Sequence, residues 1–230
     1  MHIPDGFLEL PAAAAGAAVA AAGVAVAVRR TGDSLGEREV PLAALTSAFV
    51  FAAQMVNFPV ASGTSGHLMG GVLAAVLVGP WAAVLCITVV LGVQALLFAD
   101  GGLTALGVNV VNLALVGGLG GHLLFLALRR ALGRRPSRLP LAAGVAAALS
   151  VPLAAVAFVA EFALGGAAAV DLGRLGAAMV GTHVLIGVGE GAITAAAVGA
   201  VLSSRPDLVH GARLDLGAPV RSPLAQVPAR

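Results

Sequence analysis

Long apolar runs alternate with short polar or charged breaks along this chain, and the runs have the length of membrane spans. A hydrocarbon core of about 30 Å needs roughly 20 residues of α-helix. By that measure the sequence predicts seven helical segments, over residues 11–28, 41–58, 67–78, 81–99, 103–128, 139–164 and 175–202. The third is short, and a Gly-Pro pair separates it from the fourth. We therefore predict an all-α, polytopic membrane bundle of about seven transmembrane helices, with one membrane domain over 1–202 and a polar tail over 203–230.

The arginines predict how this bundle crosses the membrane. All thirteen basic residues are arginines, and twelve of them follow the first predicted segment, follow the fifth, or lie in the tail. Only Arg174 lies elsewhere. Because short cytoplasmic loops are enriched in Arg, this placement predicts an N-terminus outside the cell and a C-terminus inside. The expected location is the inner, cytoplasmic membrane of the cell, crossed several times.

The composition excludes several classes of protein. Hydrophobic residues make up 59% of the chain and charged residues 10%, with a mean hydropathy of +1.00. Soluble and disordered proteins contain far more charged residues and fewer hydrophobic ones. Aromatic residues make up only 4% and the arginines lie between apolar runs, so we expect no nucleic-acid partner. The sequence lacks three common motifs of enzymes and ATPases, which are a Gly-rich phosphate-binding loop with Lys, a GxSxG turn and an HExxH helix. We therefore expect no enzyme activity and no ATP hydrolysis by this chain itself.

A histidine at position two is the most specific chemical feature. The chain has no basic, apolar leader before its first span, so we expect Met1 to be retained and the N-terminus to be exposed outside the cell. A free amine, the His2 backbone nitrogen and the His2 ring can then close two fused chelate rings on one metal ion. Such planar nitrogen sets suit Ni(II) and Cu(II). His67, at the predicted outer end of the third segment, is the candidate for a fourth nitrogen, and a plain surface role for His2 is the alternative.

Buried polar residues form a second group of candidates. His183 and Glu190 lie seven residues apart on nearly the same face of the last segment. They predict either a relay or support for a metal site, or a hydrogen-bonded pair that fixes helix register, and we favour the pair. Asn57, near the outer end of the second segment, either orients the loop that carries His67 or bonds across helices as amides in membranes do.

Small residues recur on one face of the first segment. Ala12, Gly16 and Ala20 are spaced by four residues, and such a face allows helices to approach closely. Packing within the bundle and docking of a partner subunit both remain open from the sequence.

Four motifs, in the same order, resemble those of one family. They are MHIPDGFL at the start, FVFAAQMVNFPVASGTSGHLMGG over 49–71, LLFADGGLTALGVNVVN over 96–112 and HVLIGVGEGAIT over 183–194. The family is the substrate-binding membrane component of energy-coupling-factor nickel and cobalt transporters, CbiM/NikM. The resemblance covers residues 1 to about 202 and leaves the tail uncovered.

This resemblance implies a metal site and a function. The implied ligands are the amine of Met1, the backbone nitrogen and imidazole of His2, and the imidazole of His67, with Thr64 and Ser65 shaping the site and Asn57 supporting it. The implied substrate is Co(II) or Ni(II), bound at the outer face for ATP-driven uptake, and the sequence does not decide between the two metals.

The resemblance also implies partners. They are a transmembrane coupling subunit, cytoplasmic ATPase subunits and a small auxiliary membrane subunit.

The alternative function is a gradient-driven secondary metal transporter that uses His183 and Glu190 near the middle of the membrane.

Overall fold

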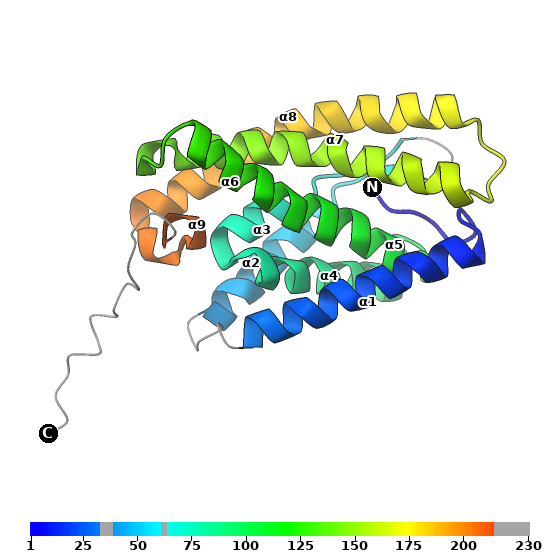
Figure 1. Ribbon diagram of the computed structural model, residues 1–230, viewed down its shortest axis with the longest axis horizontal. Coiled ribbons are helices and arrows are strands. Elements are labelled where there is room, and N and C mark those ends of the chain that lie inside the picture. Colours follow the sequence, from blue (N-terminus) through cyan, green and yellow to red (C-terminus); the bar gives the residue numbers. More distant parts are fainter. Residues whose placement is uncertain (33–38, 61–63, 214–230) are drawn as a thin grey trace, which may run out of the picture.

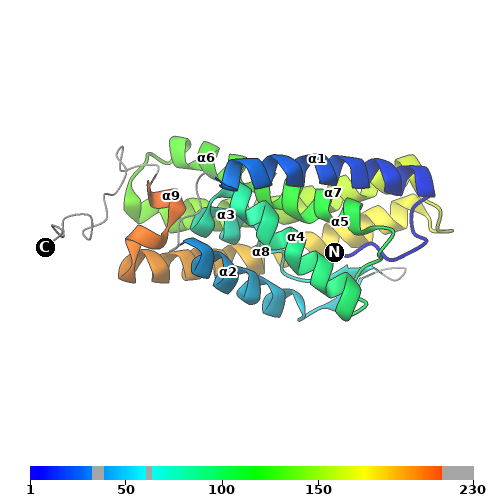
Figure 2. The ribbon, with the colours of Figure 1, turned by 90° about the horizontal axis from the view of Figure 1, so that it is seen from below.

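The computed structural model describes residues 1–32, 39–60 and 64–213, and most of them are helical. The longest helices are α1 (Leu10–Gly32), α7 (Leu139–Gly165) and α8 (Leu172–Ser204), which run along the long axis of the molecule (Figures 1 and 2). α2 (Glu39–Gln54), α3 (Gly71–Val78) and α4 (Pro80–Leu97) lie beside them. A further long helix is composite, because α5 (Leu106–Val110) continues through a π-helical segment, η1 (Val111–Gly120), into α6 (Gly121–Ala131).

Five of the predicted spans are confirmed by length and composition. Within the described residues, helices over 10–32, 80–97, 106–131, 136–165 and 172–204 are long and apolar enough to cross a membrane. α2 is apolar but has 16 residues, and α3 has 8 residues, which at 1.5 Å per residue is about 12 Å. Helices therefore form at all seven predicted places, whereas the total of seven spans stays a prediction.

The region between α2 and α3 differs from the sequence-based expectation. α2 ends at Gln54, four residues before the predicted end, and the chain then forms a short hairpin of β1 (Phe58–Pro59) and β2 (Ser65–Gly66). α3 begins only at Gly71, because Gly70 has a left-handed conformation (φ 72°) that turns the chain into the helix. His67 thus lies in a non-helical segment and not at the start of a helix, and the all-α prediction is wrong for this hairpin.

The small-residue face of α1 packs inside the bundle. A Cβ atom added at Gly107 would lie 2.3 Å from the Cα atom of Ala17, and one added at Gly16 would lie 2.4 Å from a methyl group of Val108. The backbones of α1 and α5 therefore approach closely, as small residues permit in membrane helices. Gly16 on this face therefore packs within the bundle, and docking of a partner subunit against the same face stays a prediction.

Loops that carry arginine gather towards one end of the molecule. Arg29 and Arg30 lie in the last turn of α1, and Arg129 and Arg130 lie in the last turn of α6. After α8 the chain forms a short turn, η3 (Pro206–Leu208), and α9 (His210–Arg213), which packs against α3 at the same end (Figure 1). The packed body therefore extends beyond residue 202 to Arg213, and the rest of the predicted tail, 214–230, lies outside the described residues.

The opposite end gathers the N-terminal segment and two loops. The Gly102 N–H donates to the Ile3 carbonyl at 2.8 Å, and the Glu9 N–H donates to the Gly165 carbonyl at 2.8 Å. Residues 1–9 are thereby fixed to the turn that follows α4 and to the end of α7. This end holds the histidines that the sequence singled out.

Candidate metal-binding site

The N-terminal segment is inserted into the bundle. Met1, His2 and Ile3 are 1%, 4% and 0% exposed. Asn109 of α5 holds this segment through both backbone groups of Ile3: its Oδ1 accepts the Ile3 N–H at 2.8 Å and its Nδ2 donates to the Ile3 carbonyl at 3.2 Å. The expectation of an exposed N-terminus is therefore wrong, because an amide on α5 satisfies the backbone groups that burial would otherwise leave without a partner.

The structure brings His2 and His67 together. Their rings stack with centroids 4.4 Å apart and planes inclined by 25°, although 65 positions separate them in the sequence. His67 is 1% exposed, and its Nδ1 lies 2.7 Å from the Leu68 carbonyl, which fixes the ring and directs Nε2 away from the backbone. Three buried nitrogens have no hydrogen-bond partner: Nδ1 and Nε2 of His2, and Nε2 of His67. Such orphaned groups are rare in folded proteins, so this cluster indicates a site for a ligand.

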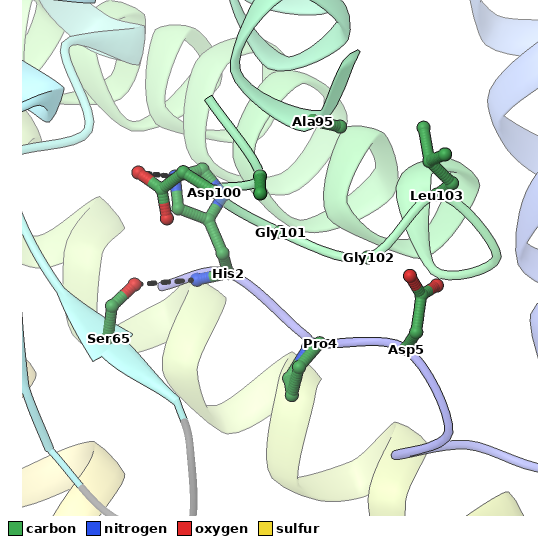
Figure 3. A pocket seen from close by; sticks show the side chains of 10 residues that line it. His2, Pro4, Asp5, Ser65, Ala95, Asp100, Gly101, Gly102 and Leu103 are labelled. Carbon is green, nitrogen blue, oxygen red and sulfur yellow. Dashed lines mark hydrogen bonds and ion pairs between the residues drawn. The ribbon is translucent and has the colours of Figure 1, made fainter. Parts of the chain in front are cut away.

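Ser65 and Thr64 both lie at this site. The His2 N–H points to the Ser65 Oγ at 3.4 Å (Figure 3). The Thr64 hydroxyl donates to the Met179 Sδ at 3.3 Å and so connects the hairpin to α8. Ser65 thus contacts the candidate ligand, whereas Thr64 fixes the hairpin strand that Ser65 begins and that His67 directly follows.

Asp100 was not predicted as a site residue, yet it faces His2. Its Oδ2 lies 3.6 Å from the His2 Nε2 (Figure 3). The same oxygen accepts a hydrogen bond from the Asn57 Nδ2 at 2.9 Å. Asn57 therefore contacts the His2 side of the site through Asp100, whereas the sequence had left open a role in orienting the His67 loop or a bond between helices. A carboxylate beside Nε2 favours the tautomer that is protonated there, which leaves the His2 Nδ1 lone pair free for a metal.

Burial also favours the uncharged forms of the N-terminal donors. Desolvation lowers the pKa of the Met1 amine well below its ordinary value, although Asp100 and Glu190 act in the opposite direction. Desolvation, together with the neighbouring amine, lowers the pKa of the His2 ring. Burial raises the pKa of the Asp100 carboxyl. The amine and the ring are therefore poised as neutral nitrogen donors near neutral pH, as metal binding requires.

A cavity of about 410 Å³ leads to His2 (Figure 3). Its walls come from the N-terminal segment, the hairpin and the turn after α4, and its carboxylates are Asp5 and Asp100. Asp5 accepts hydrogen bonds from the Thr104 N–H at 2.8 Å and from the Thr104 hydroxyl at 2.6 Å, which lower the pKa of its exposed carboxyl. The cavity therefore offers a hydrated cation a polar route, bordered by negative charge, to the two histidines.

His183 and Glu190 are both buried, but they do not form the pair that we favoured. The His183 Nδ1 lies 2.7 Å from the Met179 carbonyl on its own helix. The two carboxylate oxygens of Glu190 accept the backbone N–H groups of Met69 at 2.5 Å and of Gly70 at 2.9 Å. Seven residues of helix separate the two side chains by about 10 Å, which is too far for a hydrogen bond. Glu190 instead holds the segment that follows His67.

Side chains alone do not make a metal cage here. Within residues 1–32, 39–60 and 64–213, no group of three or more His, Cys, Asp or Glu residues is arranged to hold a metal ion. The two imidazoles are accompanied instead by the nitrogens of the Met1 amine and the His2 backbone. A metal ion at this site therefore needs main-chain nitrogens to complete its coordination.

Comparisons with known proteins agree on one family. Residues 2–208 match the family described as "Cobalt uptake substrate-specific transmembrane region". The chain is 35% identical over 219 residues to the cobalt transport protein CbiM of Sorangium cellulosum. The matched residues cover 91% of this chain and 94% of that protein. The chain is also 35% identical over 237 residues to the fused nickel transport protein NikMN of Rhodobacter capsulatus, covering 98% of this chain and 66% of that longer protein.

A solved structure has the same fold. It is a crystal structure of a truncated transition metal transporter, with a TM-score of 0.81 and 31% sequence identity. The match covers 88% of this chain and 99% of that one. The fold described above is therefore shared with that transporter over most of both chains.

Proposed function

Because the chain belongs to the family of cobalt uptake substrate-specific transmembrane regions, we propose that it captures Co(II) or Ni(II) as the membrane component of an uptake transporter. The observation that carries this proposal is the stacked pair of His2 and His67, in which the His2 Nδ1 and the His67 Nε2 are buried without a hydrogen-bond partner. The family identified from the sequence motifs is the one that the comparisons give.

The donor set supports these two metals. The proposed ligands are the Met1 amine, the His2 backbone nitrogen, the His2 Nδ1 and the His67 Nε2. Four nitrogens near one plane suit a tetragonal divalent ion better than zinc, which prefers a tetrahedron. Binding turns the two rings from stacking on each other to sharing one ion, and Asp100 keeps the His2 Nε2 protonated while this happens. Relatives are named for cobalt and for nickel, so the proposal includes both.

We also propose that the site faces outwards. The arginine-bearing loops gather at the end of the bundle opposite to His2, and short loops rich in Arg stay in the cytoplasm. The N-terminus and the cavity beside it then open to the outside, and the C-terminal tail lies inside. The chain is a multi-pass protein of the cytoplasmic membrane in this proposal.

Energy for uptake comes from other subunits in this proposal. The sequence has no phosphate-binding loop of the P-loop type, so ATP hydrolysis requires separate cytoplasmic ATPase subunits and a transmembrane coupling subunit, with a small auxiliary membrane subunit beside them. The chain itself is a transport component and not an enzyme. A gradient-driven transporter is disfavoured because both oxygens of Glu190 are engaged by backbone N–H groups.

Metal content of the purified protein tests the site. The chain that begins at Met1 should retain about one Co(II) or Ni(II) after loading and desalting. One extra alanine before Met1 should abolish retention, because it converts the amine into an amide, and His67→Ala should do the same. His210→Ala, at the other end of the bundle, is the control and should retain the metal. Equal metal in the extended and native chains would overturn the proposed ligand set.

Uptake by whole cells tests the energy source. Cells that express the chain with its proposed ATPase and coupling subunits should accumulate cobalt or nickel, and an inactive ATPase should stop accumulation. Accumulation that continues without the ATPase subunits would establish a gradient-driven transporter instead.

A further inference from the structure

A second polar cavity lies at the end of the bundle away from His2. It has a volume of about 350 Å³ and lies among α4, α6 and α9. We call it the arginine pocket, and it is lined by Pro80, His122, Phe125, Leu126, Arg129, Arg130, Arg134, His210 and Gly211. None of these residues belongs to the proposed metal site.

The arginine pocket concentrates positive charge. Three guanidinium groups come from the last turn of α6 and the turn that follows it, and the described residues of its lining include no Asp or Glu. Like charges that line one pocket repel one another, and an anion bound among them relieves this repulsion. His122 and His210 also line the pocket, but two imidazoles surrounded by three guanidinium groups do not favour a second metal ion. The charge therefore favours an anion.

His122 gives independent support for a ligand. Its side chain is 5% exposed, and its Nδ1 has no hydrogen-bond partner among the described residues. A buried polar atom without a partner destabilises the fold, and a ligand that hydrogen-bonds to it removes that cost. The ring therefore adds a hydrogen-bonding group to the charge of the arginines.

The position and walls of the pocket narrow the choice of anion. Arg129 and Arg130 close the composite helix 106–131, which is long enough to span a membrane, so the pocket lies where a span ends. Phe125, Leu126 and Pro80 add an apolar wall beside the guanidinium groups. Guanidinium groups bind phosphate oxygens in paired hydrogen bonds, and basic pockets between membrane helices bind the head groups of acidic lipids.

The geometry points to a binding site for a phosphate group in the arginine pocket, carried by the head group of an anionic phospholipid or present as the free ion. Such a ligand connects α6 to α9, because Arg130 and His122 lie on α6 and His210 lies on α9. The bound ligand would stabilise the packing of α9, which follows α8, against α3.

Lipid binding measured by native mass spectrometry tests this inference. The full chain is purified in detergent and titrated with phosphatidylglycerol, and separately with inorganic phosphate. The double variant Arg130→Gln/Arg134→Gln removes two exposed arginines that line the pocket and should weaken phosphatidylglycerol binding about 30-fold, since each basic residue near an anionic head group contributes about fivefold. The matched control is Arg29→Gln/Arg135→Gln, which removes two exposed arginines outside the lining and should change binding less than about threefold.

His122→Leu separates a binding role from a structural role. Because the His122 Nδ1 has no partner, this variant should unfold at the same temperature as the native chain or a higher one, while it binds the anion more weakly. Binding of phosphatidylglycerol that excess inorganic phosphate does not displace identifies a lipid site, and binding of phosphate alone identifies a site for the free ion. If neither ligand binds, or if both double variants lose binding equally, the inference is wrong.

Discussion

Glu190 of α8 accepts the backbone N–H of Met69 at 2.5 Å, although 121 positions separate the two residues. The Met69 carbonyl is held from the other side, because the Gln54 Nε2 of α2 donates to it at 2.8 Å. Both backbone groups of one residue are thus satisfied by buried side chains from two helices. Since Met69 lies two positions after His67, these bonds fix the segment that presents the His67 ring to His2.

Replacing Glu190 by Gln should weaken this segment. A Gln side chain has one acceptor oxygen for two N–H donors, so one buried backbone group loses its partner at a cost of about 1–3 kcal/mol. We expect a lower midpoint of thermal unfolding and about tenfold weaker metal binding, as for other changes to groups that orient a ligand. Calorimetry with Ni(II) and a thermal melt in detergent measure the two effects.

Glu161→Gln is the matched control for this change. Glu161 is another carboxylate inside the bundle, where its Oε2 accepts from the Asn112 Nδ2 at 2.6 Å, and that bond does not reach the His67 segment. Glu161→Gln should leave metal affinity unchanged, because its amide oxygen can still accept from Asn112 and this bond does not contact the metal site. Metal affinity that stays at the native value in Glu190→Gln would show that the Met69 contact does not position His67.

Asp100→Asn should reduce metal affinity about 10- to 100-fold, which is typical when the carboxylate partner of a ligating histidine is lost. The reason is that Asp100 favours protonation of the His2 Nε2, whereas an Asn amide can donate to that nitrogen and stabilise the wrong tautomer. Asp5→Asn is the control, because Asp5 belongs to the same cavity but bonds to Thr104. Titration with Co(II), followed by light absorption, measures the metal affinity of both variants. An equal loss of affinity in the two variants would indicate a general electrostatic effect and not control of the His2 tautomer.

The number of protons released by metal binding should be smaller in this protein than in a free peptide. Burial lowers the pKa of the Met1 amine and of the His2 ring, so both are already neutral at pH 7 and only the His2 amide gives up a proton. In a peptide that begins Met-His-Ile the amine has an ordinary pKa near 8 and is mostly protonated at pH 7, so about two protons leave.

Calorimetry in buffers of different ionisation enthalpy counts these protons. About one proton per Ni(II) is expected for the protein near pH 7, and the count should rise only as the pH falls towards the lowered pKa values of the amine and ring. A count of two or more at pH 7 would mean that the amine is charged in the metal-free protein.

The helices were predictable from the sequence because they depend on local properties. Apolar runs bounded by arginine, Gly-Pro or Asp-Gly-Gly place α1, α4, α7 and α8 within a few residues of their observed ends. The pairing of His2 with His67 followed from chemistry, since a planar nitrogen site needs a fourth donor. The late start of α3 was missed because the left-handed Gly70 that precedes it is not distinguishable by sequence in a chain with 31 glycines.

The supporting residues could not be predicted, because their partners are backbone groups far away in the sequence. Asn109 holds Ile3 across 106 positions, and Glu190 holds Gly70 across 120. An amide or carboxylate inside an apolar run signals that a partner exists, but it does not say which N–H or C=O that partner is. Asp100, Asn109 and Glu190 each lie within one of the four family motifs, which marks them as candidates without identifying their partners.

The close approach of α1 and α5 makes Gly107 intolerant of any side chain. A Cβ atom there would lie 2.3 Å from the Ala17 Cα atom, which is backbone and cannot rotate away, so α1 must move. Gly107→Ala should therefore destabilise the protein by about 1–3 kcal/mol, the usual result of overpacking. Gly92→Ala is the control, because a Cβ atom at that position of α4 meets no atom within 4 Å, and alanine is the better helix former. Thermal unfolding in detergent should thus show a lower midpoint for Gly107→Ala and an unchanged or slightly higher one for Gly92→Ala. Equal midpoints in the two variants would mean that α1 does not pack against α5 at this distance.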